Sequence, residues 1–253
     1  MGDWHCTQCG LSRPDLDFEA IEIQLQGVER IEFKVLSRTG EEVIEAKLPG
    51  LYNVYNALAA FTAARQLNIE AAVAQTAIAS VNAAFGRTES IQLADKDLTL
   101  LLAKNPAGAN SNLDTLLLHP DKFHLAVLLN DRIADGRDVS WIWDVDYEKI
   151  FHKIESMHVG GERAYDLALR FMYGGYSRER ITVNDKIGHL IDCLMTETPS
   201  NETIFVLPSY TAMLDLRAEL VNRGLTHDFW DCLLYTSDAA DEGLGVDLGG
   251  RRI

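Results

Sequence analysis

Residues 123–129 read FHLAVLL and are followed directly by NDRIADGRDVSWIWD at residues 130–144. The first part is a run of strand length that is apolar except for His124, which is typical of a strand buried on both faces. Similar runs occupy residues 98–102 and 204–207. Helical apolar periodicity predicts helices over residues 112–118, 162–173, 185–195 and 211–223. Strands that alternate with helices predict a mostly parallel α/β sheet covered on both faces.

The N-terminal part of the chain has a different pattern. Apolar and polar residues alternate over residues 31–35 and 43–48, which predicts a β-hairpin. Two Ala-rich stretches follow, over residues 53–67 and 69–84, and both carry apolar residues at helical spacing. This part therefore predicts a small sheet accompanied by two helices.

The pattern changes from Ser90 onward. We expect an N-terminal domain over residues 1–84 and a C-terminal domain over residues 85–231. Residues 232–253 have neither helical nor strand periodicity. They resemble the conceptual translation of a sequencing adapter, and a natural tail of low periodicity is the alternative. We expect this tail to be non-native and dispensable.

The composition limits the classes of function. The 253 residues carry 38 acidic and 23 basic side chains, for a net charge of −15. That sign opposes nucleic acid or anionic lipid as a bulk partner. No apolar run approaches the roughly 18 residues of a membrane span, and the first residues lack the pattern of a signal peptide. We therefore expect a cytoplasmic chain without a transmembrane segment.

Cys6 and Cys9 form a C-x-x-C pair followed by Gly10. Two such pairs usually supply the four thiolates of a structural zinc site. This sequence holds one of them, so the spacing predicts half of a zinc ribbon. A redox pair and incidental spacing are the alternatives, although a redox C-x-x-C normally follows a strand at the start of a helix.

Two motifs of the N-terminal half indicate a family. They are LPGLYNVYNALAA at residues 48–60 and FGRTE at residues 85–89. Gly and Asn are common at the start of a helix, but that does not explain a second Asn three residues later. Together the motifs resemble those of the Mur ligase superfamily, the ATP-dependent amide-forming enzymes of peptidoglycan synthesis. The resemblance implies ATP and Mg²⁺ as cofactors and assigns nucleotide binding to Asn53, Asn56 and Arg87.

Polar loops follow two of the predicted strands, KNPAGAN at residues 104–110 and the loop of residues 130–144. Ligands bind beyond the carboxyl ends of strands in open α/β sheets. Each loop taken alone is also compatible with simple turns and core aromatics. Together they resemble the Mur-ligase-like subunits of lipid II isoglutaminyl synthase, over about residues 1–231. This resemblance implies that residues 1–84 are the C-terminal part of a Mur ligase central domain and that a Rossmann-like C-terminal domain follows. It adds Lys104 and Asn105 to the ATP site.

The same resemblance implies an activity, a partner and a metal. The activity is ATP-dependent amidation of the D-isoglutamyl α-carboxyl of lipid II to D-isoglutamine. Ammonia would come from a GatD-type glutaminase subunit in a heterodimer. Asp138 matches the acid that orients the partner's catalytic His and is the candidate catalytic residue, and an N-cap for the turn at residues 140–143 is the alternative. Cys6 and Cys9 would be one knuckle of a zinc ribbon in the central domain.

One departure from the family pattern limits these expectations. The phosphate-binding string G-T-N-G-K-T-T does not occur in this sequence. A loop of that kind cradles the phosphates and magnesium. We therefore expect this chain alone to hold half of the ATP site at best and to be inactive by itself.

Three other functions remain open. The chain could be a docking or scaffold subunit for the glutaminase, another Mur-ligase-like amide-forming ligase, or a zinc-ribbon protein that binds nucleic acid. The net charge of −15 and the single C-x-x-C oppose the third.

Overall fold

The computed structural model describes residues 4–81 and 87–226, and of Arg87 it describes the backbone alone. The chain forms two compact units. The first holds residues 1–84, 107–122 and 145–153, and the second holds residues 85–106, 123–144 and 154–253. The tail expected to be non-native, residues 232–253, lies outside the described residues, and the expected domain boundaries remain predictions.

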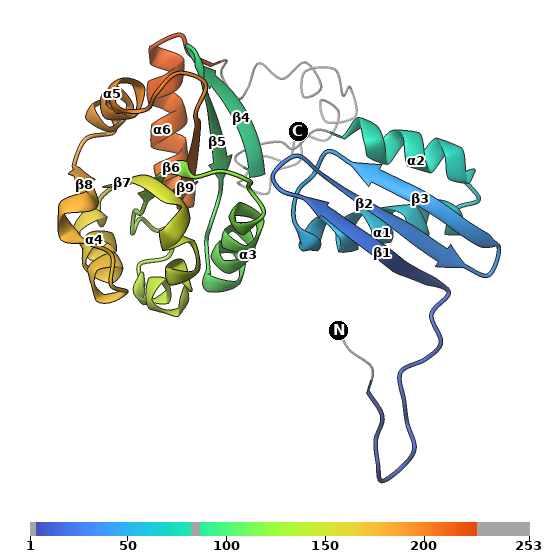
Figure 1. Ribbon diagram of the computed structural model, residues 1–253. Coiled ribbons are helices and arrows are strands. Elements are labelled where there is room, and N and C mark those ends of the chain that lie inside the picture. The colour runs from blue at the N-terminus through green and yellow to red at the C-terminus, as the bar shows by residue number, and fades with distance from the viewer. Residues whose placement is uncertain (1–3, 82–86, 227–253) are drawn as a thin grey trace, which may run out of the picture. The chain divides into compact units, whose positions relative to one another are not determined.

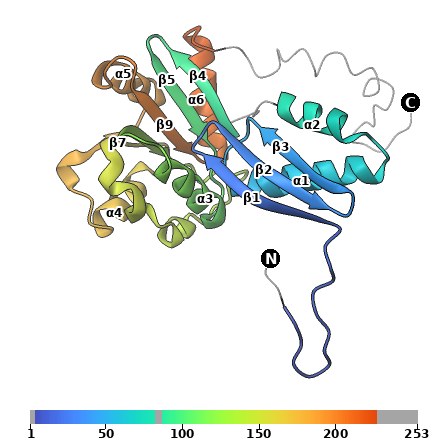
Figure 2. The ribbon, with the colours of Figure 1, turned by 45° about the vertical axis from the view of Figure 1, so that its right-hand side comes forward.

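The first unit contains a three-stranded antiparallel sheet and two helices (Figures 1 and 2). Its elements are β1 (Phe18–Gln26), β2 (Arg30–Ser37), β3 (Gly40–Ala46), α1 (Leu51–Gln66) and α2 (Ala71–Ser80). The predicted hairpin and both predicted helices are confirmed. Strand β1 was not predicted as a separate strand, and it pairs with β2.

The core of this unit follows from the period of two in β2. Ile31, Phe33 and Val35 alternate along the strand and are all buried. They pack in one cluster with Phe61 of α1 and Ile78 of α2. Because strand residues of one parity share one face, a single face of the sheet carries the apolar side chains that the helices cover.

The second unit contains a six-stranded sheet in the order β4-β5-β9-β6-β7-β8. The strands are β4 (Arg87–Leu93), β5 (Lys96–Leu101), β6 (Phe123–Leu128), β7 (Ile154–Gly160), β8 (Ile181–Asn184) and β9 (Thr203–Pro208). Neighbouring strands are parallel except for the antiparallel pair of β4 and β5. The predicted mostly parallel sheet is confirmed.

Helices of this unit lie on both faces of the sheet (Figures 1 and 2). They are α4 (Ala164–Tyr173), α5 (Ile187–Glu197) and α6 (Tyr210–Asn222). The connection through α4 leads outward from β7 to β8, and the connection through α5 returns from β8 to β9. Right-handed crossovers in opposite directions place α4 and α5 on opposite faces. All six residues of β6 are accordingly buried, as the apolar run predicts.

Helix α3 (Pro106–Leu117) begins earlier than expected. The sequence predicts a helix from residue 112, whereas in the structure the helix begins at Pro106, so that the last five residues of KNPAGAN are helical. Proline suits the first helical position because it has no N–H to satisfy. The weak helix propensities of Gly108 and Asn110 hide this start in the sequence.

Candidate functional site at the carboxyl edge of the sheet

Three loops meet beyond the carboxyl ends of β6, β7 and β9 in the second unit. Backbone hydrogen bonds join them. The N–H of Ser209 donates to the carbonyl of Leu128 at 2.8 Å, and the N–H of Leu129 donates to the carbonyl of Gly160 at 3.0 Å. Gly161 permits the close approach. A Cβ at this position would lie 2.5 Å from the carbonyl oxygen of Leu129, and the backbone φ of Gly161 is +88°.

Asn130 is the centre of this meeting point and is 1% exposed. Its Nδ2 donates to Thr211 Oγ1 at 3.0 Å and to Asp215 at 3.1 Å, both on α6. Its Oδ1 accepts the N–H of Glu162, which follows β7, at 2.9 Å. A buried amide with these partners is well satisfied, and it fixes the three loops relative to one another.

Two arginines extend the network with ion pairs. The Arg132 guanidinium contacts Asp215 at 2.8 Å and Glu162 at 2.9 Å. Hydrogen bonds that Arg132 donates to the Asp215 carboxylate, and then to Glu162, raise the pKa of Arg132 above its ordinary value. Arg163 pairs in the same way with Asp166 at 2.7 Å and with a second acid, Asp131, at 3.0 Å. The loop after β6 is thus held by paired charges along its first residues.

Asp135 attaches the middle of this loop to α6. Its carboxylate accepts the N–H of Thr211 at 2.8 Å and the Thr211 hydroxyl. The first N–H groups of a helix have no partner within the helix, so Asp135 satisfies one of them from another part of the chain. Gly136 follows with a φ of +86°, a conformation that glycine adopts without strain.

Asp138 is exposed and lies at the start of a short 3-10 helix, η1 (Ser140–Asp144). Its Oδ1 accepts the N–H of Ser140 at 2.8 Å. Hydrogen bonds from the side chain and then the backbone of Ser140 lower the pKa of Asp138. The structure therefore contains the hydrogen bond that the N-cap alternative requires, from the N–H of Ser140 to Asp138. The carboxylate is also solvent-accessible and ionised at neutral pH, as an acid that orients an imidazole needs to be.

Lys104 follows β5 at the same edge of the sheet. Its Nζ lies 4.9 Å from the ring centre of Tyr210, the first residue of α6, so the structure brings these two residues together. Asn105 is exposed and directly precedes Pro106, the first residue of α3. An ammonium group beside a helix start suits an anionic ligand.

Asn53 and Asn56 lie together in α1 of the first unit. Asn56 Nδ2 donates to Asn53 Oδ1 at 3.1 Å, and Asn53 Nδ2 donates to the carbonyl of Pro49 at 2.7 Å. Asn53 is buried, and its hydrogen bond to Pro49 fixes the segment that precedes α1, whereas Asn56 is exposed. Arg87 begins β4, and its side chain lies outside the described residues.

Cys6 and Cys9 occupy a turn in which the N–H of Gly10 donates to the carbonyl of Cys6 at 3.0 Å. Backbone N–H groups of Cys9 and then Gln8 hydrogen-bond the Cys6 sulfur and lower its pKa, as does the Cys9 side chain. Such stabilisation of a thiolate suits a metal ligand. Within residues 4–81 and 87–226, no group of three or more His, Cys, Asp or Glu side chains is arranged to hold a metal ion.

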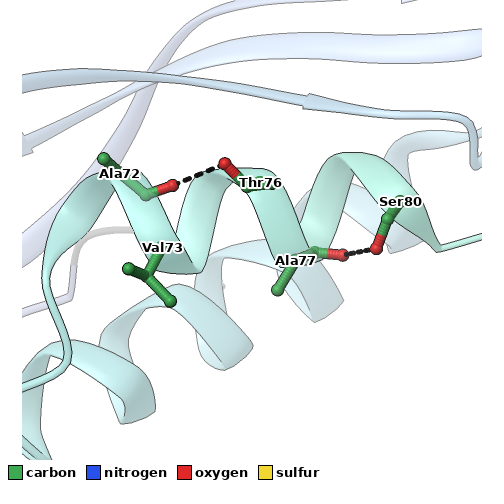
Figure 3. Close-up of a pocket in the computed structure, with 5 residues that line it drawn as sticks. All are labelled: Ala72, Val73, Thr76, Ala77 and Ser80. Carbon is green, nitrogen blue, oxygen red and sulfur yellow. Dashed lines mark hydrogen bonds between the residues drawn. The ribbon is translucent and has the colours of Figure 1, made fainter.

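A shallow hollow on α2 is the other surface feature of note (Figure 3). Five residues of this one helix line it: Ala72, Val73, Thr76, Ala77 and Ser80. Thr76 and Ser80 donate their hydroxyls to carbonyls of their own helix, at 2.8 and 2.7 Å. No polar group is therefore directed at a ligand, and the hollow is unsuited to catalysis.

Sequence reasoning missed Asn130, Thr211 and Asp215. Asn130 is the first residue of its loop, and nothing in the sequence marks it as more important than its neighbours. Its partners lie about 30 and 80 residues away along the chain. The available signal is its position, because it comes directly after a buried parallel strand, where ligand-binding and loop-fixing residues concentrate.

Across the described part of the chain, no helix is both long and apolar enough to cross a membrane.

Comparisons with solved structures show the fold. MurF from Acinetobacter baumannii has a TM-score of 0.61 at 20% identity, covering 81% of this chain and 45% of that one. Folylpolyglutamate synthase from Mycobacterium tuberculosis, solved with ADP and AMPPCP, has a TM-score of 0.57 at 19% identity, covering 85% of this chain and 49% of that one. The two units therefore have the mixed α/β fold of Mur ligase domains.

Comparisons of sequence are more specific. The MurT subunit of the glutamine-hydrolyzing lipid II isoglutaminyl synthase from Streptococcus pneumoniae (strain ATCC BAA-255 / R6) is 37% identical over 224 residues, or 88% of this chain and 49% of that protein. The MurT subunit from Staphylococcus aureus (strain COL) is 36% identical over 172 residues, or 67% of this chain and 38% of that protein. The chain spans about half the length of the curated relatives it matches. Residues 102–213 match the family described as MurT ligase C-terminal. The chain is thus a MurT homologue over 88% of its length, and its match to the MurT ligase C-terminal family covers residues 102–213.

Proposed function

We propose that the chain acts as the Mur-ligase-like subunit of a lipid II isoglutaminyl synthase in the cytoplasm. The reaction is amidation of the D-isoglutamyl α-carboxyl of lipid II, driven by ATP, with ammonia released from glutamine by a partner glutaminase. The observation that carries this proposal is the 37% identity to the Streptococcus pneumoniae subunit over 88% of the chain. The ordered loop from Asn130 to Asp138 supports it.

ATP would supply the driving force when bound: transfer of its terminal phosphoryl group to the carboxylate, with release of ADP, would give an acyl phosphate, from which ammonia would displace inorganic phosphate. Lys104 is proposed to contact phosphate oxygens, because its ammonium group is exposed and held over the Tyr210 ring at 4.9 Å. Asn105 is proposed to bind the same nucleotide beside the start of α3. Asn53, Asn56 and Arg87 are also proposed to bind the nucleotide.

Asp138 is proposed to act on the partner and not on ATP. A glutaminase uses a Cys nucleophile and a His base, and a carboxylate that orients the imidazole stabilises its protonated form. Asp138 fits this role because it is exposed and its pKa is lowered by Ser140. The two anchors of the loop, Asp135 on Thr211 and Arg132 on Asp215, limit the positions that this carboxylate can take.

Metal ions are proposed in two places. Mg²⁺ would accompany the nucleotide. Cys6 and Cys9 would supply two zinc ligands, and the hydrogen bonds that lower the pKa of Cys6 favour the thiolate that zinc requires. Two thiolates fill half of a tetrahedral site, so the present chain would hold zinc weakly.

The test is a chimera in which this chain replaces the matched half of the Streptococcus pneumoniae subunit, assembled with that enzyme's glutaminase. Lipid II is incubated with ATP, Mg²⁺ and either glutamine or ammonium chloride, and the product is weighed by mass spectrometry. Both nitrogen sources should give a product about 1 Da lighter. Lys104→Ala should abolish amidation with either source. A folded, assembled chimera that amidates with neither source would overturn the proposal.

A scaffold role is the second candidate, because the Asp138 carboxylate already accepts the N–H of Ser140. In that case Asp138 shapes a docking surface and has no part in the chemistry. Replacing Asp138 with asparagine separates the two candidates, since asparagine keeps a hydrogen-bond acceptor for Ser140 and removes the charge.

A further inference from the structure

Three polar side chains form a line at the amino ends of β6, β7 and β9. His124 is the second residue of β6, Ser156 lies near the start of β7, and Glu202 directly precedes β9. Because β6 lies between the other two strands in the sheet, His124 has one of these neighbours on each side. The line is at the opposite edge of the sheet from the candidate site described above.

Both ring nitrogens of His124 have a hydrogen-bond partner. Nδ1 lies 2.7 Å from Ser156 Oγ, and Nε2 lies 2.7 Å from Glu202 Oε2. A carboxylate only accepts hydrogen bonds, so in the neutral ring the proton is on Nε2, and Nδ1 accepts the hydroxyl of Ser156. A hydroxyl, an imidazole and a carboxylate in this order are the arrangement of a serine nucleophile with its base and its orienting acid.

The three side chains differ in their access to water. The His124 side chain is 4% exposed, whereas that of Glu202 is 45% exposed and Ser156 is half-buried. A buried imidazole keeps its hydrogen bonds to these two partners, because water does not compete for them. The base is therefore fixed, while the serine remains partly accessible.

A β-bulge in β7 lies opposite His124. Two residues of β7, at positions 155 and 156, face this single residue of β6, because the register shifts between the two strands. Bulges change the direction of nearby side chains and are frequent beside active sites. The bulge is thus a local feature that accompanies the contact of Ser156 with His124.

His158 shows that burial alone does not produce this arrangement. It lies two residues after Ser156 in β7 and is fully buried. Its Nε2 makes no hydrogen bond within the described part of the chain, and Glu197 lies 3.6 Å from that nitrogen. The short contacts on both nitrogens of His124 are therefore specific to that residue of the pair.

Arg180 places a positive charge at the same strand end. Its Nη2 donates to the carbonyl of Ile154 at 2.7 Å and to that of Glu155 at 3.4 Å. These residues directly precede Ser156. When a serine attacks an ester, negative charge develops on the carbonyl oxygen, and a nearby guanidinium suits that charge.

We infer that Ser156 is an activated nucleophile that small activated carboxylic esters acylate, with His124 as its base and Glu202 as a positioning residue. The Ser156 oxygen bonds to the carbonyl carbon, and the bond from that carbon to the alcohol oxygen breaks. The hydroxyl proton passes through Nδ1 of His124 to the departing alcohol. The product is an acyl-serine. This inference does not depend on the proposed function.

The full chain is tested with a fluorophosphonate probe and with p-nitrophenyl acetate. With the probe, the serine oxygen bonds to phosphorus, fluoride leaves and the proton passes to His124. Peptide mass spectrometry should show that Ser156 reacts roughly 100-fold faster than Ser37, which is also half-buried but contacts the Thr39 hydroxyl instead of a histidine. The acetate should acetylate Ser156, and Ser156→Ala should remove both labels.

Variants of the other two residues separate activation from structure. His124→Gln should slow the labelling of Ser156 roughly 100-fold, and Glu202→Gln should slow it roughly tenfold. Glutamine at position 202 keeps a hydrogen-bond acceptor, so a purely structural role of Glu202 would leave the rate unchanged. Asp97→Asn, which removes an exposed charge from β5, is the control and should label like the wild type.

Two results would overturn the inference. One is labelling of Ser156 no faster than that of Ser37, and the other is a wild-type rate in both His124→Gln and Glu202→Gln. If circular dichroism shows that His124→Gln does not fold, the rate of Glu202→Gln decides, because this side chain is largely outside the core. Amidation is measured separately, so the proposed function stands or falls independently of these results.

Discussion

Replacing Asp135 with alanine tests the anchoring of the loop after β6. The carboxylate accepts two hydrogen bonds from Thr211, one of them from the backbone N–H at 2.8 Å. Thr211 is 7% exposed, so water cannot readily replace the lost acceptor. A hydrogen bond to a charged group at a helix start contributes about 1.5–3 kcal/mol. We therefore expect Asp135→Ala to lower the free energy of unfolding by about 2 kcal/mol.

The assay is urea and thermal unfolding followed by circular dichroism. For a chain of this size about 2 kcal/mol corresponds to a Tm roughly 4–8 °C lower. Asp97→Ala, which removes an exposed acid of β5, is the control and should change stability by less than about 0.5 kcal/mol. A double-mutant cycle with Thr211→Val should give a coupling above about 0.5 kcal/mol. Additive effects, or an unchanged midpoint for Asp135→Ala, would refute the anchoring.

Three further predictions concern other groups. Asn130→Ala should lower the free energy of unfolding of the second unit, measured in urea, by about 3 kcal/mol, because its buried partners lose the hydrogen bonds that the Asn130 amide makes. A decrease below about 1 kcal/mol would contradict the central position of Asn130 in the network. Iodoacetamide should label Cys6 at a lower pH than Cys193, since hydrogen bonds from Cys9 and Gln8 lower the pKa of Cys6 and burial raises that of Cys193; peptide mass spectrometry showing the reverse order would exclude this. Burial lowers the pKa of His158 below 6.5, so the unfolded chain binds more protons and stability falls as the pH drops below about 6.5; His158→Gln should flatten this part of the pH profile of urea midpoints, and a parallel profile would count against it.

Sequence periodicity predicted the strands whose burial follows one regular pattern from end to end. The run of residues 123–129 became β6, with every residue of the strand buried, and the alternation of residues 31–35 became β2. Both patterns are local, so they survive in the sequence without knowledge of the fold.

The missed strands are those whose patterns are broken by polar residues. Strand β7 contains Glu155, Ser156 and His158, and β8 has four residues, so neither forms an apolar run. Strand β4 is an antiparallel edge with a polar sequence. Tertiary pairing places these segments in the sheet despite their weak local preference.

The site was predicted at the level of loops and not of contacts. The loop of residues 130–144 was expected beyond a carboxyl end, and the structure places it there. The attachment of Asp135 to Thr211 joins residues 76 positions apart, and the burial of Asn130 depends on three separate loops. No periodicity encodes such contacts, because they arise only when the sheet order brings β6, β7 and β9 together.

The rate of glutamine hydrolysis by the assembled pair tests the proposed role of Asp138. The chain and its glutaminase are mixed above the Kd of the complex, and glutamate release is compared for the wild type and Asp138→Asn. We expect the variant complex to assemble normally and to hydrolyse glutamine roughly 10²–10⁴-fold more slowly, because the carboxylate proposed to orient the imidazole is replaced by a neutral amide. An assembled Asp138→Asn complex that hydrolyses glutamine at the wild-type rate would contradict it.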